Sequence, residues 1–330
     1  MNIRTCIHLL GIVFLQSLAT MSAQTLGTWD RILIRSTFPL YDVVFTDSLN
    51  GYAVGDFGVI LRTTDSGITW SQKLSPDQFA LRNVWFFTDS IGLAAGFRGS
   101  VVRTTDAGDS WTSVDLPYDI NFPGMATAGS TVWLSGEEGL ILKSTDTGVT
   151  WTELSSGTKL LLDDISFSDE RHGWASSLQR TLLRTTDGGA SWKEHKLDTY
   201  LPVSVIRAVS ADECWLLAYQ GQVLHSIDAG ASWSQYSTYR TDYFDLKFDT
   251  EGRAWAVGRR GAIVRAQSGN RDWRLHDMVD SRRLNAITFL PNGVVIAVGD
   301  AGGIYRLASL DAGLETLDHD AENEEAMEEQ

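Results

Sequence analysis

Residues 62–70 read Arg-Thr-Thr-Asp-Ser-Gly-Ile-Thr-Trp, and the chain repeats a close copy of this string every 40 or 41 residues. A sixth, worn copy ends at Trp273, where Ser268 and Asn270 replace the aspartate and the glycine. A fixed period of this length, with one turn motif in each unit, indicates a repeat architecture. The tryptophans that end the five full copies are Trp70, Trp111, Trp151, Trp192 and Trp233.

The motif itself, an Asp box, has the chemistry of a tight turn. Aspartate and hydroxyl side chains bond to backbone N–H groups a few residues on, and glycine supplies a positive φ. We therefore predict a hairpin turn between two strands, with the tryptophan packed in the core. A catalytic or calcium-binding aspartate would not recur in every unit, and the worn sixth copy predicts a looser unit. The structural aspartates are Asp65, Asp106, Asp146, Asp187 and Asp228.

Each unit also carries a Gly-x-x-Gly turn, or a turn of the same length. Three apolar strands precede the Asp box of each unit, and a fourth strand starts at its tryptophan. The first turn positions are residues 55, 96, 136, 177, 218, 258 and 299, which gives seven units. Four strands per unit without helical periodicity predict an all-β, seven-bladed propeller. The seventh unit lacks its tryptophan, whereas Trp29 lies one period before Trp70. We expect this N-terminal strand to complete the last blade and close the ring.

The two ends of the chain differ from the repeats, so the predicted domains are a signal peptide (1–23), the propeller (24–310) and an acidic, disordered tail (311–330). A basic start, an apolar core and a small-residue exit mark the signal peptide. The protein is thus expected to be exported, either periplasmic or secreted. The tail holds nine acidic residues and no Lys or Arg, a composition that favours disorder. Its role as a solubility tail or as a docking segment stays open.

Composition excludes several classes of partner. A formal charge of −15 argues against nucleic acid, which needs a basic surface. No later segment is long enough for a membrane helix, and after cleavage Cys214 is the only cysteine, so no internal disulfide forms. The sequence contains no motif that is typical of a metal site, a nucleotide-binding loop or a catalytic nucleophile. We expect a monomer without cofactor, metal or catalytic residues.

Taken together, the boxes and the string Gly-x-x-Gly-x-Ile-Leu-Arg-Thr-Thr-Asp resemble the photosystem II stability and assembly factor family over about residues 26–310. The resemblance implies an exported or lumenal propeller without enzymatic activity. Such a protein binds a client polypeptide through an arginine-rich patch and assists the assembly of a membrane complex. The acidic tail departs from the family pattern.

Comparison between the repeats points to a binding face. The Asp-box positions hold the same residue types from blade to blade, whereas the residues inside the Gly-x-x-Gly turns vary. We expect these turns and the loops between blades to lie on one face of the disc. The loops add Tyr118, Tyr200, Tyr239, Arg240, Tyr243, Arg282 and Arg283. Tyrosine and arginine mark protein interfaces. The predicted client-binding residues are Arg98, Arg180, Arg259, Arg260, Arg282, Arg283, Tyr219 and Tyr239.

Two other functions compete with this interpretation. A sialidase-like glycosidase could use Arg98, Arg180 and Arg259 to grip a carboxylate, but Arg31-Ile32-Leu33 lacks the proline of that family's N-terminal signature. A carbohydrate- or surface-binding module would instead stack sugar rings on Phe57, Phe97 and Tyr219. A third possibility is that these turn residues form only a solvated rim.

Overall fold

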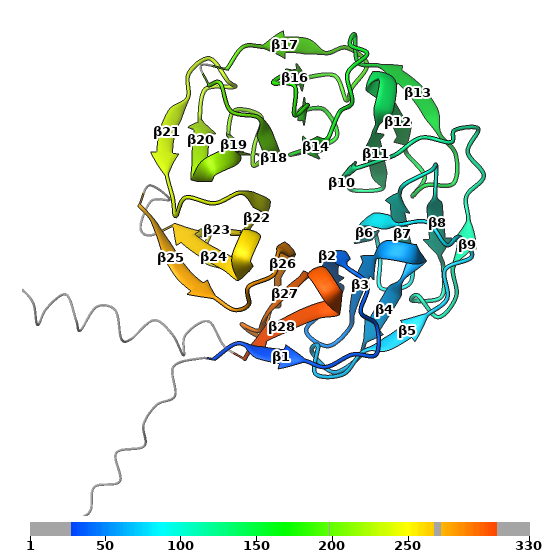
Figure 1. The fold of residues 1–330 in the computed structure, drawn as a ribbon. Coiled ribbons are helices and arrows are strands. Elements are labelled where there is room, and N and C mark those ends of the chain that lie inside the picture. Colours follow the sequence, from blue (N-terminus) through cyan, green and yellow to red (C-terminus); the bar gives the residue numbers. More distant parts are fainter. Residues whose placement is uncertain (1–27, 198, 267–271, 309–330) are drawn as a thin grey trace, which may run out of the picture.

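The computed structural model is a ring of seven four-stranded antiparallel sheets around a central channel (Figure 1). It describes residues 28–197, 199–266 and 272–308. The predicted signal peptide and acidic tail lie outside these residues. The sequence-based prediction of a seven-bladed propeller with four-stranded blades is confirmed.

Each blade is a meander that runs from the channel outward. The inner strands are β2 (Leu40–Phe45), β6 (Leu81–Phe86), β10 (Gly124–Ala128), β14 (Asp164–Phe167), β18 (Val203–Ala208), β22 (Tyr243–Phe248) and β26 (Leu284–Phe289). The second strands are β3 (Gly51–Gly55), β7 (Gly92–Gly96), β11 (Thr131–Ser135), β15 (Gly173–Ser176), β19 (Cys214–Ala218), β23 (Ala254–Gly258) and β27 (Val295–Gly299). Every residue of the second strands is buried, because each lies between two neighbouring blades.

The outer half of each blade holds the Asp box. The third strands are β4 (Ile60–Thr63), β8 (Val101–Thr104), β12 (Leu140–Ser144), β16 (Leu182–Thr185), β20 (Gln222–Ser226), β24 (Ala262–Ala266) and β28 (Gly303–Leu307). The outer strands are β5 (Ser71–Lys73), β9 (Thr112–Ser113), β13 (Thr152–Ser155), β17 (Lys193–His195), β21 (Ser234–Ser237), β25 (Trp273–Met278) and, in blade seven, β1 (Asp30–Ile32).

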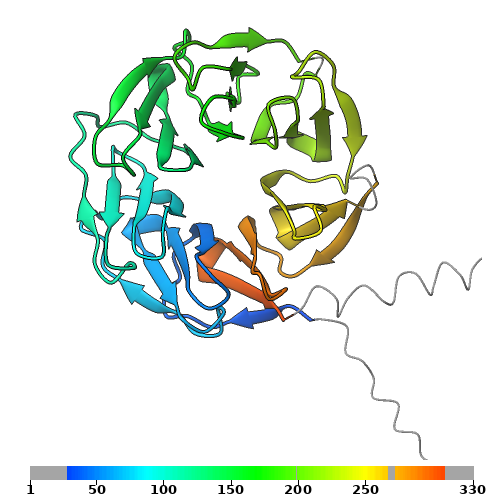
Figure 2. The ribbon, with the colours of Figure 1, turned by 180° about the vertical axis from the view of Figure 1, so that it is seen from behind.

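Strand β1 closes the ring. It pairs antiparallel with β28, with Arg31 opposite Tyr305, so the first and last described strands lie side by side (Figure 2). Trp29 packs against the core between blades six and seven. The edge that β28 would otherwise expose is therefore covered, and the predicted closure is confirmed.

The Asp boxes form the same bonds in five blades, as Asp146 illustrates. Its Oδ1 accepts from the Thr150 N–H at 2.9 Å, and its Oδ2 accepts from the Thr150 hydroxyl at 2.6 Å. The Ser144 hydroxyl donates to the same carboxylate at 2.7 Å. These bonds keep the turn compact.

The sixth blade differs from its prediction. Its worn box suggested looser packing, but Trp273 is only 6% exposed and contacts Trp215, with ring centroids 6.2 Å apart. Trp151, beside an intact box, is only partly buried. Burial here depends on the neighbouring blade and on the long strand β25 rather than on the box.

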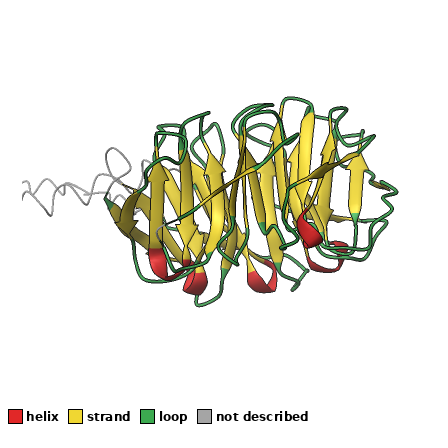
Figure 3. Ribbon diagram, turned by 90° about the horizontal axis from the view of Figure 1, so that it is seen from above, coloured by secondary structure: helices red, strands yellow, loops and turns green. Residues whose placement is uncertain are grey.

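The two kinds of turn lie on opposite faces of the disc. Single 3-10 turns occupy four Gly-x-x-Gly sites and the equivalent turn after Ala218, and they line one edge in Figure 3: η1 (Asp56–Gly58), η2 (Glu137–Gly139), η3 (Tyr219–Gly221), η4 (Arg259–Gly261) and η6 (Asp300–Gly302). Loops between blades pack closely against these turns. For example, a Cβ atom on Gly261 would lie only 2.2 Å from the carbonyl oxygen of Asp280, in the loop that follows β25. We call this side the Gly-turn face and the other side the box face.

Candidate functional site

Six of the seven variable turns share one backbone conformation. Their second inner residue is left-handed, with φ between 53° and 61°. Such a conformation costs roughly 1 kcal/mol for a residue with a side chain, and its recurrence in six blades makes it part of the fold. This position holds Arg98 in blade two and Arg260 in blade six, so these two arginines occupy equivalent places. Arg180 of blade four is also left-handed, with φ of 70°, but it stands where the other turns have their second glycine.

A pocket of about 320 Å³ lies between blades five and six on the Gly-turn face. We call it the arginine pocket; it is lined by Gln220, Tyr239, Arg240, Thr241, Asp242, Arg259 and Arg260. Arg259 Nε lies 3.0 Å from Asp242 Oδ2, and Arg240 Nη2 donates to Gln220 Oε1 at 3.1 Å. Arg260 is exposed and makes no ion pair within the described residues. Three guanidinium groups thus face a single carboxylate.

The predicted binding residues are brought together only in part. Tyr239, Arg259 and Arg260 share the arginine pocket, and Tyr219 lies in turn η3 beside Gln220. Arg98 lies in blade two, where it pairs with Asp119 at 3.1 Å and stacks over Phe79. The expected loop residue Tyr243 belongs instead to strand β22 and is fully buried.

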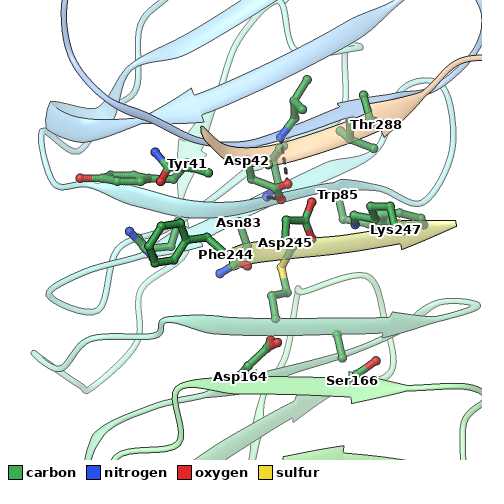
Figure 4. A pocket seen from close by; sticks show the side chains of 18 of the residues that line it. Tyr41, Asp42, Asn83, Trp85, Asp164, Ser166, Phe244, Asp245, Lys247 and Thr288 are labelled. Carbon is green, nitrogen blue, oxygen red and sulfur yellow. Dashed lines mark hydrogen bonds between the residues drawn. The ribbon is translucent and has the colours of Figure 1, made fainter. Parts of the chain in front are cut away.

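A second cavity, of about 480 Å³, is the central channel itself (Figure 4). Asp42, Asp164 and Asp245 approach it from three inner strands. Each accepts a backbone N–H from the following blade, those of Val84, Ile206 and Ile287, at 2.9–3.1 Å. These carboxylates hold neighbouring blades together across the channel wall.

Arg207 connects two of the channel carboxylates, at 3.0 Å from Asp164 and 2.6 Å from Asp245. Burial opposes its positive charge, but the two carboxylates outweigh burial and raise the pKa of Arg207. Asp42 makes no ion pair in the described part of the chain, and burial raises its pKa to about 6 even though the charge of Lys247 acts in the opposite direction. The carboxylates of Asp164 and Asp245 are therefore engaged by contacts within the channel wall.

The end of the channel on the Gly-turn face is cationic and aromatic. We call Tyr41, Arg82, Phe244 and Arg283 the channel mouth. The Arg82 guanidinium lies 4.3 Å from the ring centroid of Tyr41 and 5.7 Å from that of Phe97. Arg283 lies 4.9 Å from the ring of Phe244 and 3.4 Å from Asp300. Arginines held against aromatic faces gain cation–π attraction and keep their N–H donors free.

Sequence reasoning identified Arg283 but missed Arg82, Tyr41 and Phe244. The missed residues belong to inner strands, whereas only turns and loops were compared. One equivalent position of the seven blades, either the second residue of the inner strand or the residue just before that strand, varies as strongly as the turns and would have revealed them: it holds Tyr41, Arg82, Pro123, Asp163, Ser204, Phe244 and Asn285.

The described residues offer little else on which a reactive or metal-binding site could be built. No group of three or more His, Cys, Asp or Glu residues there could hold a metal ion. No helix among them is long and apolar enough to cross a membrane. Burial raises the pKa of the Cys214 thiol well above its ordinary value, which makes this cysteine a poor nucleophile.

A protein-family model described as "Photosynthesis system II assembly factor YCF48" matches residues 21–127, 74–162 and 157–240. The chain belongs to this family. The YCF48 assignment confirms the resemblance drawn from the boxes. A search of curated proteins found no match.

Solved structures with the same fold include two of YCF48. "YCF48 bound to D1 peptide" is 23% identical with a TM-score of 0.71, covering 85% of this chain and 97% of that one. YCF48 from Cyanidioschyzon merolae is 19% identical with a TM-score of 0.70, covering 84% and 98%. A streptogramin B lyase is 16% identical with a TM-score of 0.71, covering 84% and 96%. At these identities the likeness establishes the propeller fold alone.

Proposed function

We propose that this protein is an exported, non-enzymatic binding propeller. It captures an acidic segment of a client polypeptide on the Gly-turn face and thereby assists the assembly of a membrane or envelope complex. Membership of the assembly-factor family supports this role, as does the relative whose structure contains a D1 peptide. We further propose that it acts as a monomer in the periplasm or after secretion.

The observation that carries the proposal is the charge of the arginine pocket. Arg240, Arg259 and Arg260 face one carboxylate, Asp242, in a protein whose formal charge is −15. Local positive charge on an acidic protein attracts acidic segments selectively, and guanidinium groups form paired hydrogen bonds with carboxylates. Tyr239, 38% exposed at the same pocket, adds a flat apolar contact.

A carbohydrate-binding function remains the second candidate because of one aromatic pair. Phe38 and Phe57 are 42% and 61% exposed, and their ring centroids lie 4.7 Å apart. Exposed rings of this kind can stack on sugars. A sialidase activity has less support, since Arg98 and Arg259 each already hold a carboxylate.

Parallel peptide and glycan arrays test the proposal. We expect the purified protein to bind peptides rich in Asp and Glu, with binding that weakens between low and physiological salt. A fluorogenic sialoside should stay intact in the presence of the protein. Binding confined to glycans, or turnover of the sialoside, would contradict the proposed function.

A further inference from the structure

The channel mouth has positive charge that no internal contact neutralises fully. Arg82 makes no ion pair within the described residues and is held between the rings of Tyr41 and Phe97. Within the described residues, the only ion pair of Arg283 is a long, 3.4 Å contact to Asp300, and its buried Nε has no hydrogen-bond partner there. A buried donor without a partner is costly, so a ligand that satisfies it gains affinity.

The charges around the mouth favour an anion. Burial lowers the pKa of Arg82 and the nearby positive charge of Arg283 acts in the same direction, whereas Tyr41 and Asp42 act in the opposite direction without outweighing them. Asp42 and Asp245 in the channel wall are occupied by backbone N–H groups of the next blades, and Asp245 also by Arg207. Two close guanidinium groups without a shared carboxylate are stabilised when an external anion binds between them.

The mouth adjoins the arginine pocket through blade six. Asp242 lines the pocket and Phe244 lines the channel, and both lie at the start of strand β22, roughly 7 Å apart along an extended chain. An extended peptide crossing this edge of the blade can therefore reach both sites.

We propose that the channel mouth is a second carboxylate-binding subsite, and that the polypeptide bound on the Gly-turn face presents two carboxylates, one to Arg82 and Arg283 and one to the arginine pocket. This inference rests on the proposed function. The carboxylate at the mouth is either an acidic side chain or a free chain terminus. Linking two weak contacts in one ligand raises the overall affinity, because the second contact forms within the complex.

Fluorescence polarisation with designed peptides tests the inference on the wild-type protein. The probes are fluorescein-labelled twelve-residue peptides of Gly and Ser that carry no glutamate, one glutamate, or two glutamates separated by one, three or five residues. Each is made with a free and with an amidated C-terminus. We expect one two-glutamate spacing to bind at least about 10-fold tighter than a one-glutamate peptide. If the channel mouth binds the terminal carboxylate, a peptide with one glutamate and a free C-terminus should bind as tightly as the best two-glutamate peptide. Amidation of that C-terminus should then remove the increase in affinity.

Three variants assign the gain to the two sites. Arg82→Met and Arg283→Met keep unbranched apolar stems and should each reduce the best two-carboxylate peptide to the affinity of a one-carboxylate peptide, as should Arg260→Met at the pocket. Arg274→Met is the matched control, because Arg274 is 69% exposed on outer strand β25. Melting curves identify any variant that fails to fold, in which case the wild-type peptide series decides.

The possible failures are distinct. Equal affinity of wild type for one- and two-carboxylate peptides overturns the second subsite. The second subsite is also overturned if folded Arg82→Met and Arg283→Met bind the best two-carboxylate peptide as tightly as wild type does while Arg260→Met loses binding. The proposed function survives that result. If no acidic peptide binds the wild type, both the proposed function and this inference are wrong.

Discussion

Arg306 in the last blade donates from Nε to the backbone carbonyl of Ser66 in the first blade, at 3.0 Å, although the residues lie 240 positions apart. Similar contacts fasten neighbouring blades elsewhere: Arg103 Nε donates to the Thr147 carbonyl at 3.0 Å, and Lys143 Nζ to that of Gly188 at 3.1 Å. A cation at the end of the third strand thus bonds to the box of the next blade. The ring is closed by side chains as well as by strand β1.

Removing strand β1 should destabilise the whole domain. Deletion of residues 24–35 takes away the partner of β28 and the packing of Trp29, and it leaves an exposed sheet edge. We expect aggregation or a melting temperature lower by 10 °C or more, which for a domain of this size is on the order of 4 kcal/mol or above. Deletion of the acidic tail, 311–330, is the control and should change melting by about 1–2 °C. An unchanged melting temperature after the first deletion would refute closure.

Asp146→Ala should cost about 1–3 kcal/mol at neutral pH, because it leaves turn donors without an acceptor. Burial acts against the ionised carboxylate, but the bonds from Thr150 and Ser144 together outweigh burial and hold the pKa of Asp146 at about 2. The group therefore stabilises the fold above its ordinary pKa of 3.8 and loses this effect as the pH falls toward 2. Urea unfolding at pH 7, 4 and 2.5 should show a shrinking difference from wild type. Peptide binding by the folded variant should be unaffected.

Trp273→Ala should destabilise the protein more than Trp151→Ala. Trp273 is 6% exposed and packs on Trp215, so its truncation leaves a cavity costing about 3–5 kcal/mol. Trp151 is only partly buried, and about 2 kcal/mol is expected for its truncation. Chemical denaturation of both variants checks the order. The reverse order would show that the intact box, rather than burial, determines the contribution of the tryptophan.

Asp42→Asn should stabilise the protein at neutral pH. The folded-state pKa of Asp42, about 6, lies above its ordinary value of 3.8, so ionisation of this group destabilises the fold as the pH rises from 4 to 6. Asparagine keeps an acceptor for the Val84 N–H, and Asn83 already occupies the equivalent place in blade two. We expect a gain of up to about 3 kcal/mol at pH 7 and none at pH 4. Equal stability at both pH values would mean that water in the channel solvates the carboxylate.

Sequence reasoning predicted most of the fold because the repeats supply it many times over. The Asp-box turns, the seven-fold count and the role of Trp29 all follow from a fixed period and from turn chemistry that depends on nearby residues. The packing of Trp273 did not follow, since its burial comes from Trp215 in the adjacent blade. Trp215 lies 58 positions before Trp273, a separation that local patterns do not reveal.

The candidate site was predicted only partly for a related reason. Arg259 and Arg260 stand out in sequence as adjacent cations in one turn, and both line the arginine pocket. The stacking of Arg82 on Tyr41 and Phe97 requires knowledge of which strands line the channel and how far each extends. Ion pairing was equally hidden: Asp242 lies 17 positions before its partner Arg259.

The most direct test of the proposed function is capture of clients by the double variant Arg259→Glu with Arg260→Glu. Arg260 is exposed and Arg259 is 61% exposed, so the melting temperature should remain near that of wild type. Reversing two charges in the arginine pocket should repel acidic peptides and remove the proteins that co-purify with wild type from the native host. The matched control, Arg274→Glu on the outer rim, should retain them. A folded double variant that captures the same proteins as wild type would contradict the proposed site.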